Sequence, residues 1–190
     1  FRPQLTDLHD PFLMNDMQKA VDRLNAALCR NERILVYGDY DVDGCTAVAL
    51  VYKFLVKFYS NIDFYIPDRY DEGYGISKKG VDFAAECGVK LIIVLDCGIK
   101  AVDEIAYAKS LGIDFIICDH HVPDDVLPDA AAILNPKRKD NVYPYTHLSG
   151  CGVSLMFIQA FAANNGKVFN QHTQLLCLCA FSIASDFVPI

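Results

Sequence analysis

The sequence lacks several features that would place it in a special class of protein. It has no run of about 18 apolar residues, so we expect no transmembrane helix and no membrane partner. Internal repeats, low-complexity tracts and Gly/Ser-rich linkers are also missing, and 190 residues suffice for one packed domain. Positive charge is scarce: 17 Lys and Arg stand against 24 Asp and Glu, a formal net charge of −7. This balance argues against a generally basic nucleic-acid binder, but it allows a local basic groove or a metal that reverses the local sign.

Cysteine pairs with the spacing of a zinc site are missing as well. The chain has 8 cysteines, mostly inside apolar segments, and Cys177 and Cys179 flank a single residue with no second pair to complete a site. With 53% hydrophobic residues, the core needs no disulfides to hold it together. We therefore expect reduced thiols in a cytoplasmic protein.

Short apolar runs alternate with amphipathic stretches over most of the chain. Strands separated by helices of this length are typical of βαβ units and a parallel sheet. We predict a three-layer α/β domain with a mainly parallel sheet of about five strands flanked by helices, and a helical C-terminal portion. The predicted strands are 34–37, 63–66, 91–95, 114–118 and 130–134, and the predicted helices are 15–29, 46–58, 78–86, 102–110, 153–164 and 173–185.

This pattern divides the domain into three parts. Residues 1–30 form a helical lead-in, residues 31–136 the α/β core, and residues 137–190 a helical portion.

Polar and ionisable side chains follow four of the five predicted strands. Because the carboxyl ends of parallel strands line one edge of a sheet, we expect these side chains to meet there. Carboxylates with one or two histidines suit Mn²⁺, Mg²⁺ or Zn²⁺, and one carboxylate between the others could bridge two ions. The side chains are Asp39, Asp41 and Asp43 after the first strand, Asp96 after the third, Asp119, His120 and His121 after the fourth, and Asn135 after the fifth.

Each cluster also has a plain structural interpretation. A single Asp after a strand is most often a turn former or a helix cap, and a His pair there can serve capping and packing. The DxDxDG-like spacing at residues 39–44 is also found in calcium loops, but no Glu stands at the twelfth position and the flanks are strand and helix, which argues against an EF-hand. The joint occurrence of the clusters at successive strand ends favours a metal site.

Several segments in order resemble a known superfamily. VYGDYDVDG, LDCGI and CDHH resemble the first three motifs of the DHH phosphoesterases. Within that superfamily, GDYDVDGCTAV, IPDRYDEGYGIS and SIASDFVPI are similar to the RecJ family of single-strand-specific exonucleases, and SGCGVS matches a loop that this family carries before a helix. The resemblance covers nearly the whole chain, including DPFLMNDMQKAV near its start.

The resemblance implies a phosphodiesterase site with two divalent ions, most often Mn²⁺, with Mg²⁺ as the alternative. Asp41 and Asp43 would each ligate one ion, and Asp96 would bridge them. His120 would ligate the second ion and Asp186 would complete that site.

The remaining polar residues take supporting roles in this interpretation. His121 would face the substrate phosphate and act in catalysis together with Asp96 and His120. Asp39 would support the first ion, and Asp119 would orient a histidine ring. One position departs from the superfamily: many members have a histidine where this chain has Tyr37, which predicts weaker occupancy of the first ion.

Three further segments are candidates for substrate contact. Arg69 would pair with a phosphate, and Tyr70 or Tyr74 would stack on a base beside Gly75; alternatively this loop is a glycine turn with an ion-paired arginine. The loop with Ser149, Gly150 and Gly152 favours an anion at a helix N-terminus, or is a plain helix-entry turn. The basic run at residues 137–139 would guide a nucleic-acid backbone, or is solvated surface.

The resemblance thus implies a hydrolase that degrades single-stranded DNA from the 5′ end to mononucleotides. A small-substrate DHH phosphoesterase, acting on pyrophosphate, short oligonucleotides or a cyclic dinucleotide, is the first alternative. A non-catalytic nucleic-acid-binding module is the second. Members of the family carry a further DHH-associated domain, so we expect this chain to be a fragment.

Overall fold

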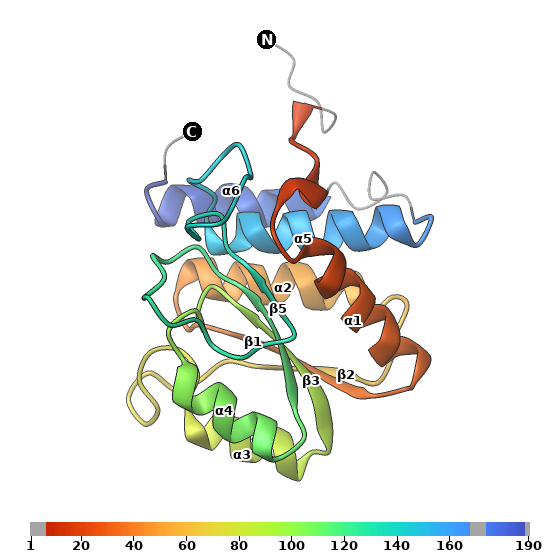
Figure 1. Cartoon of the computed structure of the whole chain (residues 1–190), viewed down its shortest axis with the longest axis vertical. Coiled ribbons are helices and arrows are strands. Elements are labelled where there is room, and N and C mark those ends of the chain that lie inside the picture. The colour runs from red at the N-terminus through yellow and green to blue at the C-terminus, as the bar shows by residue number, and fades with distance from the viewer. Residues whose placement is uncertain (1–6, 168–173, 189–190) are drawn as a thin grey trace.

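Five parallel strands form the central sheet of the computed structural model, in the order β2-β1-β3-β4-β5 (Figure 1). The structure describes residues 7–167 and 174–188. The three interior strands, β1, β3 and β4, are buried along almost their whole length, as expected for strands covered by helices on both faces. The strands are β1 (Arg33–Gly38), β2 (Ile62–Tyr65), β3 (Val89–Leu95), β4 (Asp114–Cys118) and β5 (Ala132–Leu134). The predicted parallel α/β sheet is confirmed.

The helices cover both faces of this sheet. α3 (Lys78–Glu86) and α4 (Val102–Ser110) pack on one face, and α1 (Met17–Cys29) and α2 (Val42–Leu55) on the other (Figure 1). Each face has its own apolar cluster beneath the helices. In the described parts of the chain, no helix is both long enough and apolar enough to cross a membrane. All 8 cysteines are free.

The C-terminal helices extend the layer formed by α1 and α2. α5 (Gly150–Asn164) packs along α2 and α1, and α6 (Leu176–Ser185) lies over α2 and α5, away from the sheet (Figure 1). α5 is buried on nearly all sides, which explains its almost continuous apolar sequence. The predicted start of α6 at Thr173 lies outside the described residues.

Two helices begin earlier than predicted, because a polar residue caps each of them. The Asp41 carboxylate accepts a hydrogen bond from the Gly44 N–H at 2.9 Å, so α2 starts at Val42 rather than at residue 46. The Ser149 hydroxyl accepts one from the Gly152 N–H at 3.1 Å, so α5 starts at Gly150 rather than at residue 153. Residues expected in loops therefore lie in the first helical turns.

The start of α5 sits directly against the end of β3. A Cβ atom on Gly150 would lie 2.4 Å from the Asp96 Oδ1 and 2.5 Å from its Cβ, far below any normal contact. A Cβ atom on Gly152 would meet its nearest neighbours at 3.4 Å, an ordinary van der Waals distance. The absence of a side chain at Gly150 is therefore what allows the helix to approach Asp96.

We predict opposite effects for alanine at these two glycines. Gly150→Ala should lower the free energy of unfolding by about 1–3 kcal/mol, because Asp96 has to move. Gly152→Ala should leave stability unchanged or raise it by up to about 1 kcal/mol, since alanine favours a helix over glycine. Urea unfolding followed by circular dichroism measures both. Equal stability of the two variants would contradict the close packing of α5 on Asp96.

Candidate functional site

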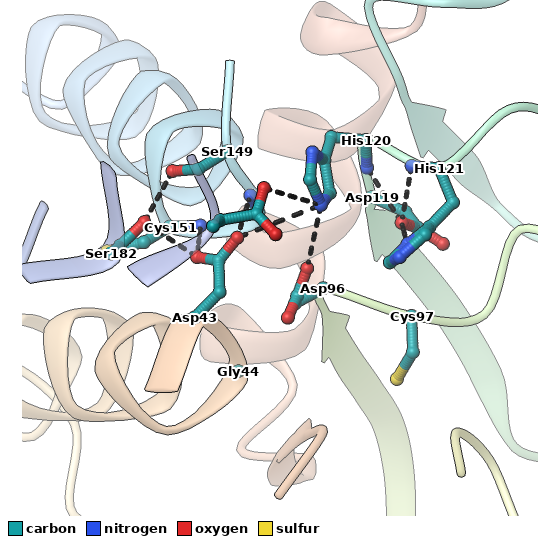
Figure 2. Close-up of polar contacts among 12 residues, drawn as sticks. Asp43, Gly44, Asp96, Cys97, Asp119, His120, His121, Ser149, Cys151 and Ser182 are labelled. Atoms are coloured by element: carbon teal, nitrogen blue, oxygen red, sulfur yellow. Dashed lines mark hydrogen bonds and ion pairs between the residues drawn. The ribbon is translucent and has the colours of Figure 1, made fainter. Parts of the chain in front are cut away.

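Asp43 anchors the site from the first turn of α2. Its Oδ1 accepts hydrogen bonds from the Cys151 N–H at 2.7 Å and from the Ser182 hydroxyl at 2.8 Å, and its Oδ2 accepts one from the Gly150 N–H at 2.7 Å (Figure 2). The carboxylate is 2% exposed, so these donors replace water. Two of them are N–H groups at the N-terminus of α5, where the helix dipole favours a negative charge. One carboxylate thus joins α2, α5 and α6.

Three carboxylates converge on one imidazole nitrogen. The His120 Nε2 lies 3.2 Å from the Asp96 Oδ1, 3.7 Å from the Asp43 Oδ2 and 3.7 Å from the Asp186 Oδ2 (Figure 2). Burial and the neighbouring His121 hold the pKa of His120 below its ordinary value, so its ring is neutral at pH 7. A neutral imidazole among carboxylate oxygens is a ready set of metal ligands.

Asp96 occupies a strained position at the end of β3. Its φ is +61°, in the left-handed region, which costs about 1 kcal/mol for a residue with a side chain. Burial and the charge of nearby Asp43 raise the pKa of Asp96 to about 11. Among the described residues, its Oδ1 has no hydrogen-bond partner, and neither has the Nδ1 of His120. A divalent cation would offset this repulsion and use the unpaired oxygen.

Asp39 and Asp41 lie beside this group but not within it. Asp39 is fully buried, and within the described chain neither of its oxygens has a hydrogen-bond partner. Burial, together with the Asp41 charge, raises the pKa of Asp39. Asp41 is exposed and caps α2. A second cation near these carboxylates is chemically suitable, and their roles as ligands stay predictions.

Asp119 fixes the second histidine of the DHH segment. Its Oδ1 accepts hydrogen bonds from the His121 Nδ1 at 2.8 Å and from the N–H groups of His120 and His121 at 2.7 and 3.0 Å. Its Oδ2 accepts one from the Ile99 N–H at 2.9 Å. Although burial acts in the opposite direction, the hydrogen bond with His121 holds the pKa of Asp119 below its ordinary value. The same hydrogen bond raises the pKa of His121.

The loop before α3 brings aromatic and basic side chains to the edge of the site. The Tyr74 hydroxyl lies 3.2 Å from the Nε2 of His121 and donates to the Asp96 carbonyl at 3.3 Å. The Arg69 guanidinium lies over the Tyr40 ring, 5.3 Å from its centre, and the Tyr40 and Tyr74 rings meet edge to face. Across the described residues no ion pair holds Arg69, which leaves its charge available. Gly75 has a φ of +79° and lets this loop turn toward β1.

Tyr37, which stands where many superfamily members have a histidine, faces away from the carboxylates. Its ring is buried under α3 and stacks on Tyr65. Its hydroxyl donates to the Gly75 carbonyl at 3.0 Å and accepts from the Ser77 N–H at 3.2 Å. Tyr37 therefore supports the loop that carries Tyr74, and a weaker first metal ion remains a prediction.

The SGCGVS loop is buried rather than open to solvent. Ser149, Gly150 and Gly152 have their polar groups engaged within the protein, in the cap of α5 and in the contact with Asp43. We interpret the loop as the support of the Asp43 carboxylate. Its direct contact with a substrate stays a prediction.

Two structural roles were not predicted from the sequence. Ser182, fully buried on α6, donates to Asp43 and contacts the Ser149 hydroxyl. It lies one helical turn before Asp186, a spacing that places both on one helix face.

Asn135 was placed at the sheet edge, but its role was not foreseen: its amide donates to the His121 carbonyl at 2.9 Å and accepts from the Lys137 N–H at 2.8 Å.

Known proteins are similar to this chain in sequence and in fold. The model of the DHH family, N-terminal domain, matches residues 33–181. The single-stranded-DNA-specific exonuclease RecJ of Bacillus subtilis is 42% identical over 184 residues, and RecJ of Escherichia coli is 37% identical over 187 residues. These matches cover 97% and 93% of this chain but 23% and 32% of the relatives, so the chain spans about a quarter to a third of their length.

Solved structures agree with this result. A crystal structure of exonuclease RecJ bound to manganese has a TM-score of 0.82 at 28% identity, covering 93% of this chain and 44% of that one. RecJ from Thermus thermophilus in complex with Mn²⁺ has a TM-score of 0.78 at 25% identity, covering 93% of this chain and 25% of that one. The family model spans most of the chain, including the ends of all five strands. The chain therefore belongs to the DHH family.

Proposed function

We propose that this chain is the catalytic domain of a RecJ-type exonuclease, a hydrolase that removes nucleotides from the 5′ end of single-stranded DNA. The convergence of Asp43, Asp96 and Asp186 on the His120 Nε2 carries the proposal. The similarity to exonucleases named as specific for single-stranded DNA supports the substrate class. The 8 free thiols suit a reducing compartment such as the cytoplasm.

Two divalent cations, Mn²⁺ by preference and Mg²⁺ as the alternative, fit this set of donors. Asp43, His120 and Asp186 would hold one ion, since their ligand atoms lie within 4.8 Å of one another. Asp96 would bridge to a second ion beside Asp41, with Asp39 in support. When bound, such ions supply an activated water and offset the charge that develops on a phosphate.

The protein's own side chains would orient the phosphate. Asp119 holds the His121 ring by its Nδ1, and the Tyr74 hydroxyl lies 3.2 Å from the Nε2 and 3.4 Å from the Nδ1. Because the pKa of His121 is raised, its ring can donate a hydrogen bond to a phosphate oxygen. Arg69 would attract the next phosphate of the strand. Tyr74, 56% exposed, offers a ring face to a base.

We predict that Asp96→Asn removes nuclease activity while the fold persists. The substitution keeps the shape of the side chain and removes the charge that would join the two ions, so the rate should fall more than about 100-fold. Release of mononucleotides from 5′-labelled single-stranded DNA with Mn²⁺ measures it. Asp22→Asn, an exposed change on α1, is the matched control and should retain full activity.

The choice of substrates separates the alternatives. Cleavage of dinucleotides, cyclic dinucleotides or pyrophosphate with no digestion of long strands would indicate a small-substrate phosphoesterase. Tight binding of single strands with neither Mn²⁺ binding nor cleavage would indicate a non-catalytic module. Full activity of Asp96→Asn on single strands would refute the bridging role.

We also predict that Ser182→Ala weakens Mn²⁺ binding about 10-fold. The hydroxyl orients the Asp43 carboxylate, and groups that orient metal ligands typically contribute about 10- to 100-fold to affinity. Ser154→Ala is the matched control: Ser154 is equally buried, and its hydroxyl donates to the Gly150 carbonyl rather than to Asp43. Electron paramagnetic resonance of free Mn²⁺ measures affinity without any reaction. Equal affinities of the two variants would contradict the role of Ser182.

A further inference from the structure

A cavity of about 460 Å³ opens beside His121. Its walls come from the loop before α3, the loop between β3 and α4 together with the first turn of α4, and the residues after β4. His121 and Asp119 border it, whereas Asp43, His120 and Asp186 do not. It is therefore a separate compartment that adjoins the carboxylate site through the His121 ring. We call it the side pocket.

The charges around the side pocket are largely paired. The Asp119 carboxylate is held by the His121 Nδ1 at 2.8 Å, and both residues border the pocket. The Lys100 ammonium of the lining lies 3.4 Å from the Asp124 carboxylate, which offsets its charge. Glu104 contributes a further carboxylate to the wall. This carboxylate favours a neutral hydrogen-bond donor over an anion.

The apolar surface of the side pocket suits an aromatic ring. Ile76, Cys97 and Ile99 are 8%, 1% and 1% exposed and form an apolar base of the pocket. Tyr74 lies in the wall with a half-exposed ring. At Gly75 the only atom within 4 Å of an added Cβ would be the Cys97 Cβ, at 3.9 Å, so a side chain there would enter the space between two lining residues.

We propose that the side pocket binds the nucleobase of the nucleotide whose phosphate lies at His121. This inference rests on the proposed function, since it assigns a place to one part of the same substrate. A base would stack on Tyr74 and cover the apolar base of the pocket. The Glu104 carboxylate can accept from an exocyclic amino group, which cytosine, adenine and guanine carry and thymine lacks. The pocket would therefore favour amino-bearing bases over thymine.

Two alanine-to-phenylalanine substitutions, one just before α4 and one within it, test whether a base binds in the side pocket. Ala101 lines the pocket and is half-buried, so Ala101→Phe would fill part of it. Ala106 is exposed on the same helix and does not line the pocket, so Ala106→Phe adds the same group elsewhere. Titration with 2′-deoxycytidine in the absence of metal, followed by NMR, should show at least about a 10-fold weaker Kd for Ala101→Phe and an unchanged Kd for Ala106→Phe. Equal Kd values of wild type and Ala101→Phe for 2′-deoxycytidine would refute base binding in the side pocket.

Glu104→Gln tests the selection among bases without filling any space. Wild type should bind 2′-deoxycytidine more tightly than thymidine, and the amide, which can both donate and accept, should reduce this preference. Equal affinities of wild type for the two nucleosides would overturn the role of Glu104. This variant also provides a test should Ala101→Phe melt at a lower temperature than wild type.

Hydrolysis separates failure of the pocket from failure of the proposed function. Ala101→Phe should raise the KM for a strand with cytosine at its 5′ end at least about 10-fold and leave kcat and the cleavage of a strand with an abasic 5′ residue unchanged. If strands are cleaved normally and Ala101→Phe has no effect, base binding in the side pocket is refuted while the exonuclease function stands. If nucleoside binding depends on Ala101 but no strand is cleaved, base binding in the side pocket is supported and the proposed exonuclease function is refuted.

Discussion

The arrangement of the site depends on the contact between the Asp43 carboxylate and the first N–H groups of α5. This contact joins the chain at a separation of 107 residues and fixes α5 against the end of the sheet. Gly150 permits the approach, since any side chain there would collide with Asp96. Ser182 adds α6 to the same carboxylate, and Asp186 follows one turn later. The Asp43 carboxylate thus holds α5 and α6, and with α6 the Asp186 side chain, at the edge of the sheet.

Buried aspartates in this protein fall into two kinds. Asp119 has hydrogen-bond donors on both oxygens, and its pKa is lowered despite complete burial. Asp39 and Asp96 are as deeply buried, but oxygens of both lack donors in the described chain, and their pKa values are raised. Asp119, like the buried Asp43, is satisfied by donors of the protein itself. A cation would supply the missing partner of the carboxylates left unsatisfied.

The sequence predicted the fold and the edge of the sheet at which the site forms, because apolar runs and strand ends are local features. It placed Asp96 and His120 together for the same reason. It did not predict that Tyr37 supports the loop that carries Tyr74, since the bond from its hydroxyl to the Gly75 carbonyl joins residues 38 positions apart. Nor did it predict Ser182, whose partner lies 139 residues away. Such contacts follow from the packing of helix on helix, which periodicity alone does not specify.

Because α6 lies in the outer layer, it folds onto the protein after the elements that it covers. Asp186 and Ser182 belong to a helix that rests on α2 and α5 and has no strand of its own. During synthesis the sheet and α5 can form before α6 leaves the ribosome, because α6 follows them in the sequence. Under the proposed function, the set of candidate ligands is complete only once α6 has docked. A growing chain would then hold cations weakly until Asp186 is in place.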